Sequence, residues 1–149
     1  MPTHKELLEN LDHCVCANLR KAARVVTQAY DEVFRPLKLK ATQVIILVRV
    51  AKAGSLTINI LADKLSLDRT TLTRNLKPLQ RGGYLRVDAG KDKRERVVLL
   101  TPKGQAVLVK AFPLWKKVQA RLVKTVGADD CLELFKKIDH LMGAFGGSS

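Results

Sequence analysis

Apolar residues recur at every third or fourth position through most of this chain, which is the spacing of one face of an α-helix. Between Lys5 and Phe34 that face consists of Leu8, Leu11, Val15, Leu19, Ala22, Val26, Tyr30 and Val33. A run of about thirty residues is long for one globular helix. We therefore predict one long helix over this region, ended by Pro36, with part of its apolar face packed against another chain.

The same spacing predicts five further helices. Their expected limits are Thr42 to Gly54, Thr57 to Leu65, Asp68 to Gly82, Thr101 to Gly127, and Asp129 or Asp130 to Met142. Thr57, Asp68 and Thr101 are expected N-cap residues, because their side-chain oxygens can accept a hydrogen bond from the first turn of a helix. Glycine at Gly54, Gly82 and Gly127 is typical of helix ends.

The apolar period changes to two in the stretches "YLRVD" and "RVVLL", which flank a charged segment. Two such runs around a short polar segment predict a β-hairpin. Before it, a short helix, the turn "LSLD" and a second helix have the layout of a helix-turn-helix. The sequence therefore predicts a mainly α fold with a small β-hairpin wing, that is, a winged helix-turn-helix.

The net charge of +13 is strong and uneven. Arg49 to Gly104 holds 13 Lys and Arg against 5 Asp and Glu, whereas Gly127 to Ser149 holds 2 against 4. Such an imbalance indicates a polyanionic partner. Aromatic residues make up only 5%, so few side chains are available to stack on unpaired bases. We therefore expect the partner to be double-stranded DNA.

Other global features bear on the compartment. No apolar run approaches the ~20 residues needed to span a bilayer. The first residues contain no apolar signal-peptide core. Three cysteines without framework spacing suit a reducing compartment. We therefore expect a cytoplasmic protein with no membrane partner.

Two groups of residues are candidate DNA contacts. The expected recognition helix carries Arg69, Thr70, Thr71, Thr73, Arg74 and Lys77, and the wing carries Lys91, Lys93, Arg94 and Arg96. Arginine can read guanine and threonine can meet a thymine methyl or a phosphate, so either group can face bases or backbone. We expect Asp92 and Glu95 to hold the wing arginines in position. A solvated basic surface without a partner is the alternative.

These segments resemble a known family. "LADKLSLDRTTLTRNLKPLQRGGYLRV" followed by "DKRERVVLLTPKG" is similar to the winged helix of the MarR transcriptional regulators, whose wing pattern is matched by Asp92, Arg94 and Leu100-Thr101. The resemblance implies a DNA-binding domain over 37–101, a dimerisation domain from 1–36 and 102–146, and Arg94 as the minor-groove arginine; we add a disordered tail at 147–149. It also implies a homodimer that acts as a repressor on a pseudo-palindromic operator and is released by a small anionic or phenolic ligand or an oxidant.

The first cysteines raise a second resemblance. "LDHCVCANLRKAARVVTQAY" is similar to the organic-hydroperoxide-sensing branch of this family, in which a reactive cysteine lies fourteen residues before a tyrosine, as Cys16 does before Tyr30. A second tyrosine of that branch is replaced by Arg20. On a regular helix, His13 and Arg20 would share the face of Cys16 and stabilise its thiolate. A packed apolar cysteine is the alternative.

The residues predict neither an enzyme nor a cofactor. No nucleophile–base set and no phosphate-binding glycine loop is visible. His13 with Cys16 supplies only two ligands, so no metal site is expected. We predict a sequence-specific DNA-binding transcriptional regulator. The alternatives are an architectural or non-specific duplex-binding protein and a peroxide-reducing enzyme that depends on Cys16.

Overall fold

The computed structural model describes residues 1–146 and has the predicted mainly helical fold with a small sheet. The helices are α1 (His4–Leu11), α2 (Val15–Phe34), a 3-10 turn (Arg35–Leu37), α3 (Ala41–Ala53), α4 (Ile58–Leu65), α5 (Arg69–Arg81), α6 (Pro102–Val126) and α7 (Ala128–Phe145). The strands are β1 (Ser55–Thr57), β2 (Leu85–Ala89) and β3 (Arg96–Leu100). The predicted tail at 147–149 lies outside the described residues.

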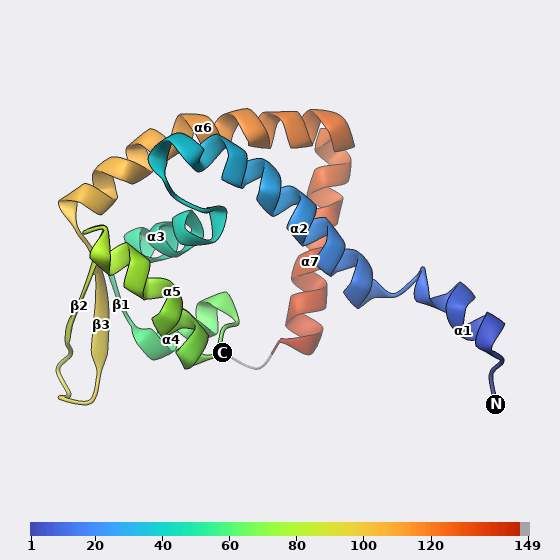
Figure 1. The fold of residues 1–149 in the computed structure, drawn as a ribbon, viewed down its shortest axis with the longest axis horizontal. Coiled ribbons are helices and arrows are strands. Elements are labelled where there is room, and N and C mark those ends of the chain that lie inside the picture. The colour runs from blue at the N-terminus through green and yellow to red at the C-terminus, as the bar shows by residue number, and fades with distance from the viewer. Residues whose placement is uncertain (147–149) are drawn as a thin grey trace.

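The elements form two regions in space. Figure 1 shows α6 along one edge of the molecule with α2 beside it, and α3, α4, α5 and the sheet gathered beneath one end of α6. From the other end of α6, α7 turns back toward the opposite edge, while α1 projects beyond α2. Among the described residues, no helix is both long and apolar enough to cross a membrane.

The core lies mainly within the winged helix-turn-helix. The largest fully buried side chains are Phe34, Leu47, Val50, Leu61, Leu72, Leu76, Leu79 and Val98. The three leucines of α5 are among them, at the spacing of one helix face. Their burial holds α5 by its inner face, so the opposite face is presented to solvent.

The sheet has one strand more than the sequence predicted. Its order is β1-β3-β2, and all pairs are antiparallel. In β1, Ser55 lies opposite Leu99 and Thr57 opposite Val97. Three residues are too few to show alternation, and Thr57 is also the N-cap of α4, so the sequence pattern does not reveal this strand. This strand joins the wing to the beginning of α4.

The predicted single helix from Lys5 to Phe34 is wrong, because the chain breaks between α1 and α2. Cys14 has an extended backbone (φ −66°, ψ 113°) and is the N-cap of α2. The Asn18 side-chain amide donates to the carbonyls of Asp12 at 3.0 Å and Cys14 at 2.9 Å, which satisfies groups that the break exposes. The apolar spacing continues across the break and no Gly or Pro marks it, so the sequence contains no signal for it.

The other helix limits agree closely with the predictions. The Thr57, Asp68 and Thr101 side chains each accept a backbone N–H bond as N-caps. Gly54 ends α3 with a φ of 77°, a conformation that favours glycine. The last helix begins at Ala128, slightly before the expected Asp129 or Asp130.

Candidate nucleic-acid interface

The first turn of α5 is fixed by a cap. One oxygen of the Asp68 carboxylate accepts from the Thr71 backbone N–H at 2.8 Å, and the other accepts from the Thr71 hydroxyl at 2.6 Å. Thr71 is half-buried, and its hydroxyl proton is already donated. Of the predicted contact residues on this helix, Thr71 thus serves the helix start, while the others lie on the open side.

These hydrogen bonds also perturb the Asp68 carboxyl. The Thr71 hydroxyl, and then the Thr71 backbone N–H, lower the pKa of Asp68 below its ordinary value of 3.8. Because the pKa of Asp68 is lower in the folded state, its carboxylate stabilises the fold at pH values above its ordinary pKa. This contribution is lost as the pH falls through the lowered pKa of the folded state.

We expect Asp68→Ala to lower the urea midpoint of unfolding at neutral pH, because a cap bond to α5 is lost. The difference in urea midpoint between the parent and Asp68→Ala should shrink in strong acid, because the Asp68 carboxylate of the parent becomes protonated there and loses its charge. Asp68→Asn is the control, since its amide oxygen can still cap but does not titrate. A difference between parent and Asp68→Ala that stays constant from neutral pH to strong acid would contradict this assignment.

The outer face of α5 is basic and hydroxyl-rich. A shallow hollow of about 340 Å³ is lined by Arg69, Thr70, Thr73, Arg74 and Lys77, which we call the α5 face. All five side chains are exposed, and no carboxylate lines the hollow. The structure therefore brings together the predicted residues of this helix, except Thr71, on the side opposite its buried leucines.

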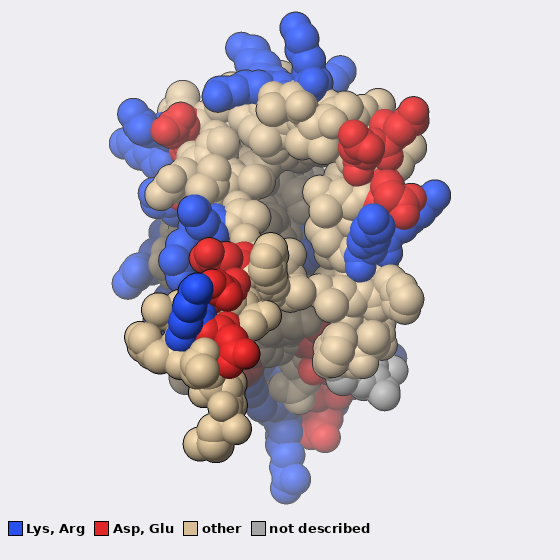
Figure 2. Space-filling view, turned by 90° about the vertical axis from the view of Figure 1, so that its right-hand side faces the viewer, with Lys and Arg blue, Asp and Glu red and all other residues tan. Residues whose placement is uncertain are grey.

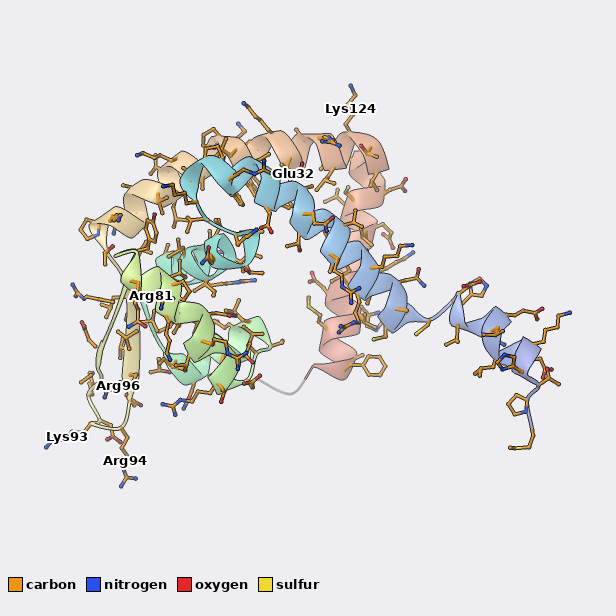
Figure 3. The ribbon with its side chains drawn as sticks, in the orientation of Figure 1. Glu32, Arg81, Lys93, Arg94, Arg96 and Lys124 are labelled. Atoms are coloured by element: carbon orange, nitrogen blue, oxygen red, sulfur yellow. The ribbon has the colours of Figure 1, made fainter. Side chains whose placement is uncertain are left out.

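The wing places its basic residues at and near its tip. The Asp92 carboxylate accepts from the Arg94 backbone N–H at 3.1 Å, and the Glu95 N–H donates to the Asp92 carbonyl at 2.9 Å. The Asp92 carboxylate thus holds the backbone of the turn, and it does not form the expected pair with an arginine side chain. Lys93 and Arg94 project beyond the tip, as Figure 3 shows.

The four wing cations that the sequence marked as candidate contacts have no carboxylate within ion-pair distance. The ion pairs among residues 1–146 are Lys5–Glu9, Lys40–Asp31 and Arg86–Asp88. None of them involves Lys91, Lys93, Arg94 or Arg96, which are all exposed. Their charge is therefore available to a polyanion.

The wing and α5 are both tied to the beginning of α6. The Thr101 hydroxyl donates to the Gly83 carbonyl at 2.6 Å, and the Lys103 ammonium donates to the Gly82 carbonyl at 2.6 Å. Gly104 packs so closely that an added Cβ would collide with the Tyr84 carbonyl and the Leu100 side chain. These contacts set where the wing stands relative to the α5 face.

The cysteine cluster is not assembled as predicted. Cys16 is exposed in the first turn of α2, and Arg20 is exposed one turn later. His13 lies in the break before α2, so it does not share the helical face of Cys16. Within the described residues, no group of three or more His, Cys, Asp or Glu can hold a metal ion.

Tyr30 lies away from Cys16 and contacts α6 instead. Its hydroxyl donates to the Gln119 side-chain oxygen at 2.7 Å, and its ring stacks on Phe34 at 6.2 Å between centroids. Burial raises the pKa of Tyr30 above its ordinary value of 10.0. Along α2, Tyr30 and Cys16 are about 21 Å apart at 1.5 Å per residue, so one subunit does not bring them together.

Two cavities border α2. One of about 500 Å³ lies among α2, α3 and α6. Its walls are mainly apolar and include Tyr30, Val48 and Trp115, and the cations Arg49 and Lys52 also line it. The sequence did not indicate this cavity, because its walls come from three separate helices.

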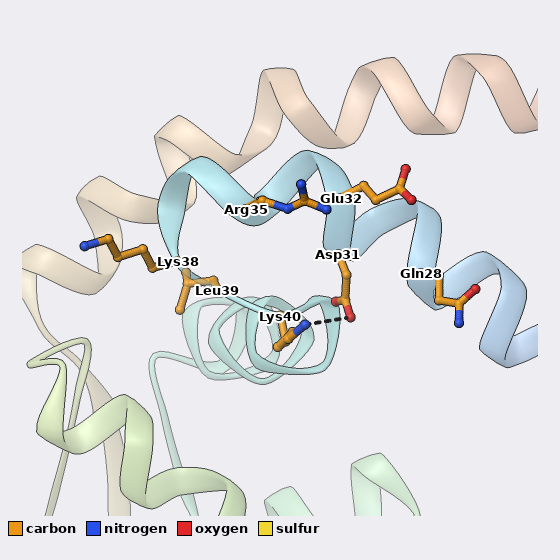
Figure 4. A pocket seen from close by; sticks show the side chains of 7 residues that line it. All are labelled: Gln28, Asp31, Glu32, Arg35, Lys38, Leu39 and Lys40. Carbon is orange, nitrogen blue, oxygen red and sulfur yellow. Dashed lines mark ion pairs between the residues drawn. The ribbon is translucent and has the colours of Figure 1, made fainter.

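The second cavity is polar and measures about 520 Å³ (Figure 4). There the Asp31 carboxylate accepts from the Ala41 N–H at 2.7 Å and lies 3.5 Å from the Lys40 ammonium. Asp31 therefore connects the end of α2 to the start of α3. No helical spacing links these residues, so the contact could not be predicted from the sequence.

Comparison with known proteins identifies the fold family. A family model described as MarR family matches residues 37–95. The transcriptional regulator MosR of M. tuberculosis, crystallised in complex with DNA, is 42% identical with a TM-score of 0.81, and the match covers 88% of this chain and 95% of that one. A MarR mutant from E. coli complexed with operator DNA is 24% identical with a TM-score of 0.82, covering 89% and 96%.

A curated relative gives a shorter match. The uncharacterized HTH-type transcriptional regulator YwoH of Bacillus subtilis is 28% identical over 87 residues, which are 58% of this chain and 64% of that protein. The match to YwoH thus spans slightly less than two thirds of its length. Together with the winged helix-turn-helix and the close likeness to MosR over nearly its whole length, these matches confirm the predicted resemblance. This chain belongs to the MarR family of transcriptional regulators.

Proposed function

We propose that the protein is a sequence-specific regulator, acting as a repressor, that binds double-stranded DNA as a homodimer. The α5 face carries this proposal, because it presents two arginines, two threonines and a lysine on the outer side of one firmly packed helix. An α-helix fits the major groove, where arginine and threonine can contact base edges or phosphates. The wing cations stand beside it, available to the adjacent minor groove or backbone.

Selection of bound duplexes from a random pool tests this function. A sequence-specific homodimer should enrich a pseudo-palindrome whose half-sites are one helical turn, about 34–36 Å, apart. An architectural protein would enrich no motif, and that result would contradict the proposal.

The dimer rests on apolar side chains that one subunit leaves uncovered. The larger ones in the segments 1–36 and 102–146 include Leu7, Leu8, Leu11, Val15, Leu19, Leu132, Phe135, Met142 and Phe145. No residue of α1 is buried, and Cys131 alone is buried among the residues of α7. Figure 2, which views the molecule from this side, shows broad areas without Lys, Arg, Asp or Glu (tan) around a central hollow. Exposed apolar surface of this extent is typical of a protein interface.

We expect sedimentation at micromolar concentration to give twice the 16.6 kDa mass of the chain. Phe135→Asp should weaken the dimer, because a carboxylate would be buried at the interface without a partner. Ile60→Asp is the matched control, since Ile60 is comparably exposed (47% against 48%) but lies on α4. A stable folded monomer of the parent protein would rule out this assembly.

The apolar cavity among α2, α3 and α6 supports a small-molecule effector. Its apolar walls suit an aromatic or aliphatic body, and the two cations that line it suit a carboxylate. Benzoate-class carboxylates should raise the Tm of the parent, because a ligand that binds only the folded state stabilises it. The rise should be smaller in Lys52→Ala but not in Lys38→Ala, whose lysine lines the polar cavity instead. An unchanged Tm across such compounds would remove this effector class.

Cysteine oxidation is the other proposed signal, and the exposure of Cys16 supports it. An organic hydroperoxide would convert the Cys16 thiolate to a sulfenic acid and leave as the alcohol, adding polar volume close to the proposed dimer interface. We expect a stoichiometric amount to release DNA from the parent and from Cys14→Ser, but not from Cys16→Ser. Unchanged DNA binding after complete modification of Cys16 would remove this role, whereas continued turnover with a reductant would indicate a peroxide-reducing enzyme.

A further inference from the structure

A small hollow lies between the tip end of the wing and the helix-turn-helix. It measures about 200 Å³ and is lined by Thr57, Ile58, Asn59, Arg69, Arg94, Glu95 and Arg96, which we call the wing hollow. These residues come from the end of β1, the first turn of α4, the first residue of α5 and the hairpin with β3. A water molecule occupies about 30 Å³ in the liquid, so the wing hollow has room for a phosphate group.

The wing hollow is strongly positive. Three arginines line it against one carboxylate, that of Glu95. None of these four groups belongs to an ion pair among residues 1–146. Concave surfaces that carry one sign of charge concentrate the electrostatic potential and attract the opposite charge. Asn59 adds an exposed amide at the same place.

The position of the wing hollow identifies the anion. If the α5 face enters a major groove and the wing tip enters the adjacent minor groove, one sugar–phosphate strand must pass between them. The wing hollow lies at this position, because Arg69 begins α5 while Arg94 and Arg96 belong to the wing. Resting on the proposed DNA-binding function, we propose that the wing hollow binds one phosphodiester of the strand that separates the two grooves.

This assignment gives individual roles to residues of both groups. Arg69 and Arg96 contact the phosphate and carry no base preference, whereas sequence is read by the remaining residues of the α5 face. Asn59, which the sequence did not mark as a contact, donates its amide N–H to the same phosphate. Glu95 opposes binding by its charge, so the wing hollow is tuned below its highest affinity.

Binding measured against salt concentration, on both a selected operator and a random duplex, tests the proposal. Log K falls as log salt rises, and each lost phosphate contact reduces the magnitude of this slope by about one unit. We expect Arg96→Ala to lower that slope equally on both duplexes and to leave the ratio of the two affinities unchanged. Asn59→Ala should weaken both complexes by equal factors, and Glu95→Gln should tighten both. Arg86→Ala is the control, because its guanidinium is paired with Asp88 at 3.0 Å and does not line the hollow.

A duplex with a single neutral methylphosphonate linkage locates the contact. One linkage in each half-site should weaken binding by the parent. Arg96→Ala should lose less affinity than the parent at that same linkage, because only Arg69 and Asn59 still contact the phosphate there. The proposal is overturned if Arg96→Ala keeps the parental slope, or if every linkage weakens Arg96→Ala by the same factor as it weakens the parent. Loss of sequence preference in the parent would instead contradict the proposed function, while the effects on a random duplex would still decide the role of the wing hollow.

Discussion

Leu76→Ala is expected to lower the free energy of unfolding by about 2–5 kcal/mol, the usual cost of removing a buried leucine side chain. Leu76 is 1% exposed and lies in the middle of α5, between the equally buried Leu72 and Leu79. Its removal leaves a cavity directly beneath the helix that presents the α5 face. Urea unfolding followed by circular dichroism measures the change.

Lys77→Ala is the matched control, because the substituted residue is adjacent on the same helix but exposed. Its stability should stay within about 0.5 kcal/mol of the parent, as for most surface substitutions. Its affinity for DNA should fall and its salt dependence should become shallower, since a cation of the α5 face is lost. If Lys77→Ala destabilises the fold and Leu76→Ala does not, α5 does not pack with its leucines inward and its cations outward.

Arg94→Ala should weaken operator binding by about 1–3 kcal/mol, the range expected for one well-placed groove contact. Arg94 projects from the wing tip (Figure 3), and Asp92 fixes its backbone N–H while leaving the guanidinium available. The fold should be unaffected, because the side chain is exposed and belongs to no ion pair among residues 1–146. Fluorescence anisotropy with a labelled operator measures the loss.

Arg86→Ala again provides the comparison. Arg86 is also an exposed wing arginine, but it lies on β2 and is paired with Asp88. We expect its variant to bind the operator like the parent. Equal losses in Arg86→Ala and Arg94→Ala would mean that the wing contributes only general positive charge, and parental binding by Arg94→Ala would exclude the wing tip from the interface.

The helix-turn-helix and its wing could be predicted because their signals are local. Asp68 and Thr101 precede apolar helical spacing, glycines follow it, and the two strands of the hairpin alternate on either side of charged residues. The α5 face follows from the same spacing, since the buried positions Leu72, Leu76 and Leu79 determine which residues point outward. Local signals of this kind do not depend on how distant segments meet.

The features that the sequence did not predict depend on contacts between distant segments or on the backbone. The break at Cys14 has no glycine or proline to mark it, and β1 forms only because β3 lies beside it. The wing hollow joins Asn59 to Arg96 across 37 positions of the chain. Asp31 meets the start of α3 only after the turn at Arg35–Leu37 reverses the chain. The spacing of apolar residues along the chain does not indicate such contacts.

The measurement that tests the central claim most directly is competition between a selected operator and a shuffled duplex of the same composition, at one fixed salt concentration. A sequence-specific regulator should prefer the operator by about a thousandfold or more. The preference should survive in Arg96→Ala and should diminish when Thr73 or Arg74 of the α5 face is replaced by alanine. Equal affinity of the parent for the two duplexes would contradict sequence-specific binding and would leave a protein that binds DNA by charge alone.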